Sequence, residues 1–249
     1  MAFFEAHNLH KRFGSRVVLE NVSLSIREGQ VSGIMGPNGA GKTTCFHVLT
    51  GLHRPDRGEI LLEGRSIAGL APQQIARLGI SRSFQIMNLF DDSVVIENVM
   101  LALPEFRARR LNFTGNVFAE TELVDAATDI LDQVGLAERA WDKATALSYG
   151  DRRALEIGVA LAARPRLLFL DEPTSGLGAE ATRNLAALVR RLRKRYTIVM
   201  IEHDMRFLFD LADRISVIHW GQVIAEGTPD ELRSNKWVRR SALGETADA

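Results

Sequence analysis

The chain has 249 residues, with 31 basic and 31 acidic side chains, so its formal net charge is zero. This balance argues against a nucleic-acid-binding protein, which needs a positive face for phosphate contacts. The length suffices for one good core with a small appended subdomain. The single cysteine, Cys45, excludes an internal disulfide, suits a reducing compartment and is expected to be a packing residue. No stretch of about 18 residues is apolar enough to cross a bilayer, and residues 1–7 lack a signal-peptide pattern.

The N-terminal part is predicted to contain short strands and helices. Residues 3–9 and 17–26 alternate apolar and polar side chains, which predicts two antiparallel strands. An apolar strand at 31–35 leads through a glycine-rich turn into a helix at 42–51, which ends at Gly51, a residue suited to a helix C-terminus. The shorter elements that follow are a strand at 58–64, a helix at 72–78 and a strand at 80–84.

The pattern changes from Gln85 onwards. Helical periodicity at 93–103 and 123–134 flanks a polar, basic stretch, and a third helix is predicted at 151–163. Strands and helices then alternate, with strands at 166–170, 197–201 and 214–219, helices at 179–194 and 205–212, a hairpin into 222–226, and a terminal helix from Pro229 to Arg233.

This order predicts an α/β fold with a mainly parallel sheet, because alternating strands and helices cover both faces of such a sheet. The two N-terminal strands form an antiparallel β-subdomain. We expect one domain, in which residues 1–84 and 165–235 form the core, residues 85–164 form an inserted α-helical subdomain, and residues 236–249 form a C-terminal tail.

The glycine-rich turn carries the first chemical motif. Residues 36–43 match G-x-x-x-x-G-K-[ST], the phosphate-binding loop, whose backbone N–H groups and following helix point at phosphates. Lys42 is suited to the β- and γ-phosphates, and the Thr43 hydroxyl to Mg²⁺. A chance glycine-rich turn is the alternative. The predicted nucleotide contacts are Gly36, Pro37, Asn38, Gly39, Ala40, Gly41, Lys42, Thr43 and Thr44.

A second motif ends the apolar strand at 166–170. Asp171 follows that strand directly and is predicted to bind Mg²⁺ through its water shell. Glu172 points differently and is the candidate to orient or deprotonate an attacking water. Two solvated carboxylates at a strand end are the alternative.

With these motifs in order, the chain resembles the nucleotide-binding subunits of ATP-binding-cassette transporters, from about Phe4 to Leu243. The resemblance implies a P-loop NTPase core with a RecA-like sheet, and ATP and Mg²⁺ as ligands. Phe13 matches the adenine-stacking aromatic, and Gln85 matches the loop glutamine that touches Mg²⁺. His203 matches the histidine that senses the γ-phosphate. A core aromatic at Phe13 and a strand-end histidine at His203 are the alternatives.

The sequence Leu147-Ser-Tyr-Gly-Asp151 matches the family's signature loop. The resemblance implies that Ser148, Tyr149 and Gly150 bind ATP held by Lys42 of a second subunit, in a homo- or heterodimer. Three positions depart from the family pattern. Tyr149 stands for glycine, Asp151 for glutamine, and Gly178 for an aspartate, which puts the coupling of the two ATP sites in doubt.

The detailed match is closest to the ATPase subunits of branched-chain amino-acid importers, on stretches such as Gly79–Gln85 and Glu202–Met205. It implies an ATP-hydrolysing peripheral subunit on the cytoplasmic face of the inner membrane. The implied partners are integral membrane permease subunits, with a periplasmic solute-binding protein acting indirectly. Residues 84–99 are expected to receive a short helix from the permease. Relatives in the same branch serve urea, short amides or envelope-lipid export, so these stay open as alternatives.

Other classes of protein fit the sequence less well. A GTPase needs Asn-Lys-x-Asp to recognise guanine, and the nearest string, 235–238, ends in valine. A soluble cassette ATPase acting on DNA or ribosomes usually carries tandem cassettes or a long coiled-coil insert. An interaction module with an inactive site conflicts with the presence of Lys42, Asp171, Glu172 and His203.

Overall fold

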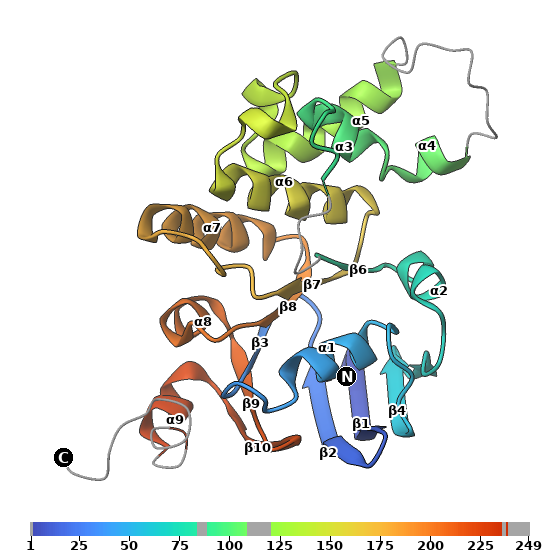
Figure 1. Ribbon diagram of the computed structural model, residues 1–249, viewed down its shortest axis with the longest axis vertical. Coiled ribbons are helices and arrows are strands. Elements are labelled where there is room, and N and C mark those ends of the chain that lie inside the picture. Colours follow the sequence, from blue (N-terminus) through green and yellow to red (C-terminus); the bar gives the residue numbers. More distant parts are fainter. Residues whose placement is uncertain (1, 84–88, 109–120, 236–237, 239–249) are drawn as a thin grey trace.

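The computed structural model describes residues 2–83, 89–108, 121–235 and 238. Figure 1 shows three groups of elements: a mainly parallel sheet with its helices, an antiparallel sheet beside it, and a set of helices stacked at one end. The helices of the 95–162 region lie farthest from the antiparallel sheet.

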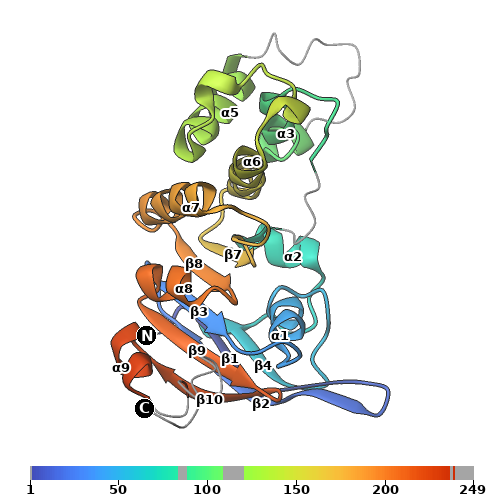
Figure 2. The same ribbon diagram turned by 60° about the vertical axis from the view of Figure 1, so that its left-hand side comes forward.

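The antiparallel sheet has the strand order β2-β1-β4-β5. Residues in β1 and β2 alternate between buried and exposed positions over much of their length, so one face packs on the core. Figure 2 shows the β1–β2 hairpin extending beyond the rest of the core. The strands are β1 (Phe4–Phe13), β2 (Arg16–Ile26), β4 (Arg57–Leu62) and β5 (Arg65–Ser66).

The second sheet has the order β10-β9-β3-β8-β7-β6 and is parallel except for the β9–β10 pair. Every residue of its three central strands is buried, as expected for a parallel sheet covered on both faces. The strands are β3 (Val31–Met35), β6 (Ile80–Arg82), β7 (Leu167–Asp171), β8 (Thr197–Ile201), β9 (Arg214–His219) and β10 (Gln222–Gly227).

Helix α1 (Lys42–Leu49) packs between the two sheets, and Cys45 is buried there as predicted. The opposite face of the parallel sheet is covered by α7 and α8 (Figure 1). The other helices of this part are α2 (Pro72–Arg77), α7 (Ala179–Leu192), α8 (Met205–Leu211) and α9 (Pro229–Ser234).

The helical part comprises α3 (Val95–Met100), α4 (Pro104–Ala108), α5 (Thr121–Val134), α6 (Tyr149–Ala162) and two short 3-10 helices, η2 (Ala137–Arg139) and η3 (Ala144–Ala146). Its apolar side chains join those of α7 and β3 in one continuous cluster. Across the described ranges, no helix combines the length and the hydropathy needed to cross a membrane.

The structure confirms the predicted fold class, and it moves the ends of most predicted strands and helices by one to several residues. Helix α6 begins at Tyr149 instead of residue 151, because Ser148 caps it. Helix α3 ends at Met100, because the N–H groups of Ala102 and Leu103 bond three residues back instead of four, and α4 begins at Pro104. Asp171 belongs to β7, where it pairs with Ile201. The division into core, helical subdomain and tail remains a prediction.

Candidate functional site

The phosphate-binding loop lies between β3 and α1, and its tight path depends on glycine. A Cβ on Gly36 would lie 2.0 Å from the carbonyl oxygen of Ile218, and one on Gly41 would lie 2.8 Å from that of Val18. Gly41 also has a φ of +101°, a backbone conformation that residues with a Cβ rarely adopt. The loop is therefore held against β2 and the end of β9. Thr43 and Thr44 follow in the first turn of α1, half-buried.

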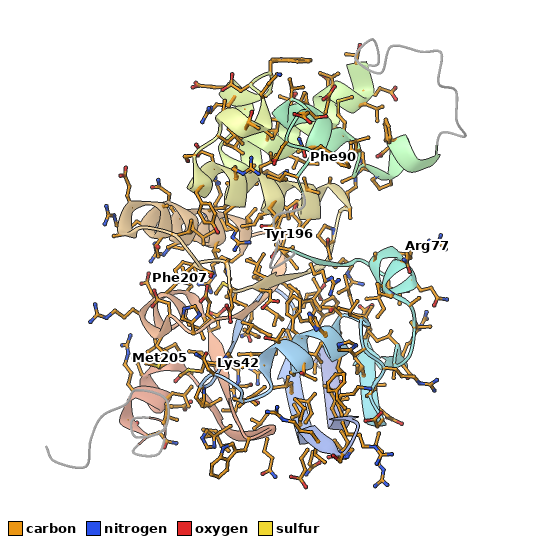
Figure 3. The ribbon with its side chains drawn as sticks, in the orientation of Figure 1. Lys42, Arg77, Phe90, Tyr196, Met205 and Phe207 are labelled. Carbon is orange, nitrogen blue, oxygen red and sulfur yellow. The ribbon has the colours of Figure 1, made fainter. Side chains whose placement is uncertain are left out.

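The Lys42 side chain folds back over this loop (Figure 3). Its Nζ donates hydrogen bonds to the carbonyl oxygens of Gly36 at 2.8 Å and Pro37 at 3.0 Å. Burial lowers the pKa of Lys42, and the nearby carboxylates of Glu172 and Asp171 oppose this shift. The loop thus presents an ammonium group across a cradle of main-chain donors, which fits a polyphosphate.

Asp171 ends strand β7 and is 2% exposed. Burial and the neighbouring Glu172 carboxylate raise its pKa from the ordinary value of 3.8 to about 6, against the opposing influence of Arg82 and Arg153. Its main-chain N–H donates to the hydroxyl of Ser83, the residue that follows β6. Because burial makes the Asp171 carboxylate costly to ionise on its own, its position suits a site in which a bound cation compensates the negative charge.

Glu172 is the first residue beyond β7 and adopts a left-handed backbone conformation with φ +42°. Its N–H donates to the carbonyl oxygen of Ile201 at 2.9 Å, while its side chain stays 21% exposed. The strand pairing places it beside the residues that follow β8, and Nδ1 of His203 lies 3.9 Å from its Oε2. Solvent therefore reaches a carboxylate and an imidazole that stand together.

Glu202 precedes His203 and is fully buried. Its carboxylate accepts hydrogen bonds from the N–H of Thr174 at 2.8 Å and from that of His203 at 3.2 Å, and burial raises its pKa. Glu202 therefore ties the loop that follows Glu172 to the loop that carries His203.

The signature loop lies at the start of α6, in the helical part (Figure 1). The Ser148 hydroxyl accepts from the N–H of Asp151 at 3.1 Å, a helix N-cap. The Asp151 carboxylate lies 2.8 Å from that hydroxyl and pairs with Arg139 at 3.0 Å, so the extra charge relative to the family pattern is compensated. The Tyr149 hydroxyl donates to the carbonyl oxygen of Ser175 at 3.3 Å.

The remaining predicted residues differ in how the structure presents them. Phe13 is not a core aromatic: it is 46% exposed at the end of β1, edge-on to His53. Gln85 lies outside the described residues. Gly178 is the N-cap position of α7 and makes no side-chain cap.

Three contributors were missed by the sequence reasoning: Ser83, Arg153 and Glu202. Glu202 carries the one sequence signal among them, an acidic residue directly after the apolar run 198–201 and beside the candidate histidine. Ser83 and Arg153 come from segments whose approach to β7 depends on the tertiary structure.

A cavity of about 850 Å³ lies between the core and the helical part. Its walls come from α2, β6, the segment before α4 and the C-terminal half of α6. Leu89 contributes from the 84–99 stretch, of which residues 84–88 are outside the described part of the chain.

The family model described as ABC transporter matches residues 19–175. The chain is 42% identical to a "high-affinity branched-chain amino acid transport ATP-binding protein" of Salmonella typhimurium, over 96% of both chains. It is 40% identical to a protein of the same description from Pseudomonas aeruginosa, over 97% of both.

A solved structure has the same fold. The ADP conformation of MJ1267, described as an ATP-binding cassette of an ABC transporter, superposes with a TM-score of 0.88 at 30% identity, covering 98% of this chain and all of that one. With a family match over more than half of the chain and relatives of this identity, the chain belongs to the ABC transporter family, as an ATP-binding cassette ATPase.

Proposed function

We propose that this chain is the ATPase subunit of an importer for branched-chain amino acids or a related small polar solute. The observation that carries the ATPase part is the convergence of Lys42, Asp171, Glu172 and His203 at the ends of β3, β7 and β8. The solute is suggested by the names of the relatives, which describe branched-chain amino acid transport.

The phosphate loop, residues 36–44, binds the polyphosphate of ATP in this proposal. Its N–H groups and the Lys42 ammonium compensate the phosphate charge, and Phe13 is exposed to stack on the adenine. Thr43 and Asp171, with Gln85, are the residues that would hold Mg²⁺, which supplies charge neutralisation on the phosphate oxygens when bound. The raised pKa of Asp171 fits a carboxylate that awaits a cation.

Glu172 is the proposed general base, because it is the carboxylate that combines solvent access with a fixed backbone. It orients the attacking water and accepts its proton, and His203 donates a hydrogen bond toward the γ-phosphate. The Glu202 carboxylate accepts hydrogen bonds from the main-chain N–H groups of Thr174 and His203. It thereby holds the loop after Glu172 and the loop that carries His203 in place for this step.

A second cassette subunit completes each ATP site in the proposed assembly. Ser148, Tyr149 and Gly150 of one subunit face the phosphates bound to the other, and the N-terminus of the 14-residue helix α6 favours an anion there. The ion pair between Asp151 and Arg139 keeps the departure at residue 151 compatible with this role.

The permease partner is proposed to dock at the cavity between the core and the helical part. Leu89, which belongs to the stretch expected to receive a permease helix, lines this cavity. In this proposal the chain is a peripheral subunit at the cytoplasmic face of the inner membrane, and the solute-binding protein acts on the other side.

The assembly is tested by purifying the tagged chain from native membranes in mild detergent and identifying what accompanies it. Two polytopic membrane proteins, a second cassette and a periplasmic binding protein are expected, and ligand screening on the last names the solute. A urea- or amide-binding protein, or a lipid-export assembly, would move the assignment to those branches. A soluble homodimer with no membrane partner would overturn the transport function.

The chemistry is tested separately with Glu172→Gln. This variant is expected to bind ATP with wild-type affinity and to hydrolyse it at least about a hundredfold more slowly, because a general base contributes on that scale. Unchanged turnover would show that another group is the base.

A further inference from the structure

A buried ion pair on α6 lies between the large cavity and the loop that follows β7. The Arg153 and Glu156 side chains are 2% and 5% exposed, and a guanidinium nitrogen of Arg153 lies 2.6 Å from Oε2 of Glu156. Glu156 also forms part of the cavity wall. The two residues are one helical turn apart, so the pair is fixed by the helix itself.

The other terminal nitrogen of the same guanidinium reaches the catalytic loop. It donates to the main-chain carbonyl oxygen of Glu172 at 3.4 Å. Arg153 therefore spans two partners with the two arms of its planar fork, a fixed geometry that the compact ammonium group of a lysine does not reproduce.

The backbone of Glu172 needs such support. Its φ of +42° lies in the left-handed region, which residues with a Cβ adopt at a cost and keep only where neighbours fix it. Its N–H is held by the carbonyl oxygen of Ile201, and its own carbonyl oxygen accepts from the N–H of Ser175 at 3.0 Å and from Arg153 at 3.4 Å. These three contacts fix the two peptide groups from which the Glu172 side chain extends, and Arg153 is the one side chain among the three partners.

We propose that Arg153, anchored by Glu156, is a positioning residue for Glu172 in ATP hydrolysis. The inference rests on the proposed role of Glu172 as the base. Arg153 touches neither nucleotide nor water in this role, and it acts by holding the peptide group of the catalytic glutamate.

Arg153→Lys is the decisive variant, because it keeps the charge beside Glu156 and loses the second arm. The kcat of the full chain is expected to fall roughly 10- to 100-fold, the effect of misplacing a reacting group slightly, with the KM for ATP changed less than about twofold. Arg152→Lys is the matched control. Arg152 is the adjacent arginine on α6, bonded to Asp91 and to the carbonyl oxygen of Ala144, and its variant should keep wild-type kcat.

A purely structural role is separated by a double-mutant cycle. If Arg153 acts through Glu172, adding Arg153→Lys to Glu172→Gln lowers the residual rate no further. If the lysine variant does not fold, Arg153→Met with Glu156→Met removes both charges together, which buried pairs tolerate, and should fold and show the same loss of kcat.

The inference is overturned by wild-type kcat in a folded Arg153 variant, or by equal losses with and without Glu172. If Glu172→Gln itself has no effect on hydrolysis, the proposed function fails first, and the two failures are thereby told apart.

Discussion

Nδ1 of His203 lies 3.9 Å from Oε2 of Glu172, although the two residues are contributed by different strands. The pairing of Asp171 with Ile201 in neighbouring parallel strands brings them together, because each follows the end of its strand by one or two residues. The distance is too long for a hydrogen bond, so both groups remain available to a ligand between them.

Replacing His203 with alanine should separate hydrolysis from stability. We expect the rate of phosphate release to fall at least about tenfold, because the hydrogen-bond donor positioned toward the γ-phosphate is lost. Since the side chain is 53% exposed, the free energy of unfolding should change by less than about 0.5 kcal/mol. His7→Ala, at a half-exposed position on β1, is the control and should leave both unchanged. A His203 variant with normal turnover would remove this residue from the site.

Asp171→Asn should stabilise the ligand-free chain while it abolishes activity. The folded-state pKa of about 6 exceeds the ordinary 3.8, so between these values the folded chain holds a proton that the unfolded chain releases. Stability therefore falls as pH rises through this window, and the penalty is complete above about pH 6. Asparagine cannot ionise. The free energy of unfolding at about pH 7.5 should rise by about 1–3 kcal/mol. Denaturant titration at that pH, without Mg²⁺, measures it; a loss of stability would contradict the burial argument.

Two substitutions of Glu202, to alanine and to glutamine, test the hydrogen bonds that its carboxylate accepts. Glu202→Ala leaves the N–H of Thr174 without its acceptor in a buried place, which should cost about 1–3 kcal/mol and lower turnover. Glu202→Gln keeps an acceptor oxygen and should cost clearly less. Thermal unfolding and ATPase rates check both variants, and equal effects would mean that the hydrogen bonds to the loop are unimportant.

The ion pair between Arg139 and Asp151 predicts that removing the arginine weakens ATP binding, because the charge of Asp151 is then no longer balanced. Arg139→Ala should leave Asp151 uncompensated beside the phosphate-facing loop, and therefore raise the KM for ATP and weaken ATP-dependent dimerisation. Stability should change by less than about 1 kcal/mol, since the pair is partly exposed. Asp142→Asn removes the charge of the second acidic partner of Arg139 and is the control. Adding Asp151→Asn should restore the lost affinity; failure to do so would point to a steric cause.

Phe13→Ala tests the proposed adenine contact. The ring is exposed and already lies edge-on to His53, so its loss should weaken ATP binding by about 1 kcal/mol, roughly fivefold, with little effect on folding. Val17→Ala, at an exposed position on the same hairpin, is the control. Equilibrium binding with a fluorescent ATP analogue measures the difference, and equal affinities would exclude stacking on Phe13.

Much of this site could be predicted from the sequence because its motifs are local. The glycines of the phosphate loop, Lys42, and the carboxylates after an apolar strand carry their chemistry within a few residues. The periodicity of the strands and helices likewise indicated the fold class. The errors lay at the ends of strands and helices, such as Tyr149, where a serine cap decided the boundary, and Asp171, which belongs to β7.

The tertiary structure decided the relationships between distant residues. Parallel pairing of β7 with β8 set Glu172 beside His203, and the packing of α6 brought Arg153 to the carbonyl oxygen of Glu172. It also placed Arg139 beside Asp151, so the negative charge by which the signature loop departs from the family pattern is compensated by an ion pair. Side-chain type and spacing determine which chemistry a chain can supply. Which groups meet depends on long-range strand register and helix packing, because these contacts join segments that have no local constraint on one another.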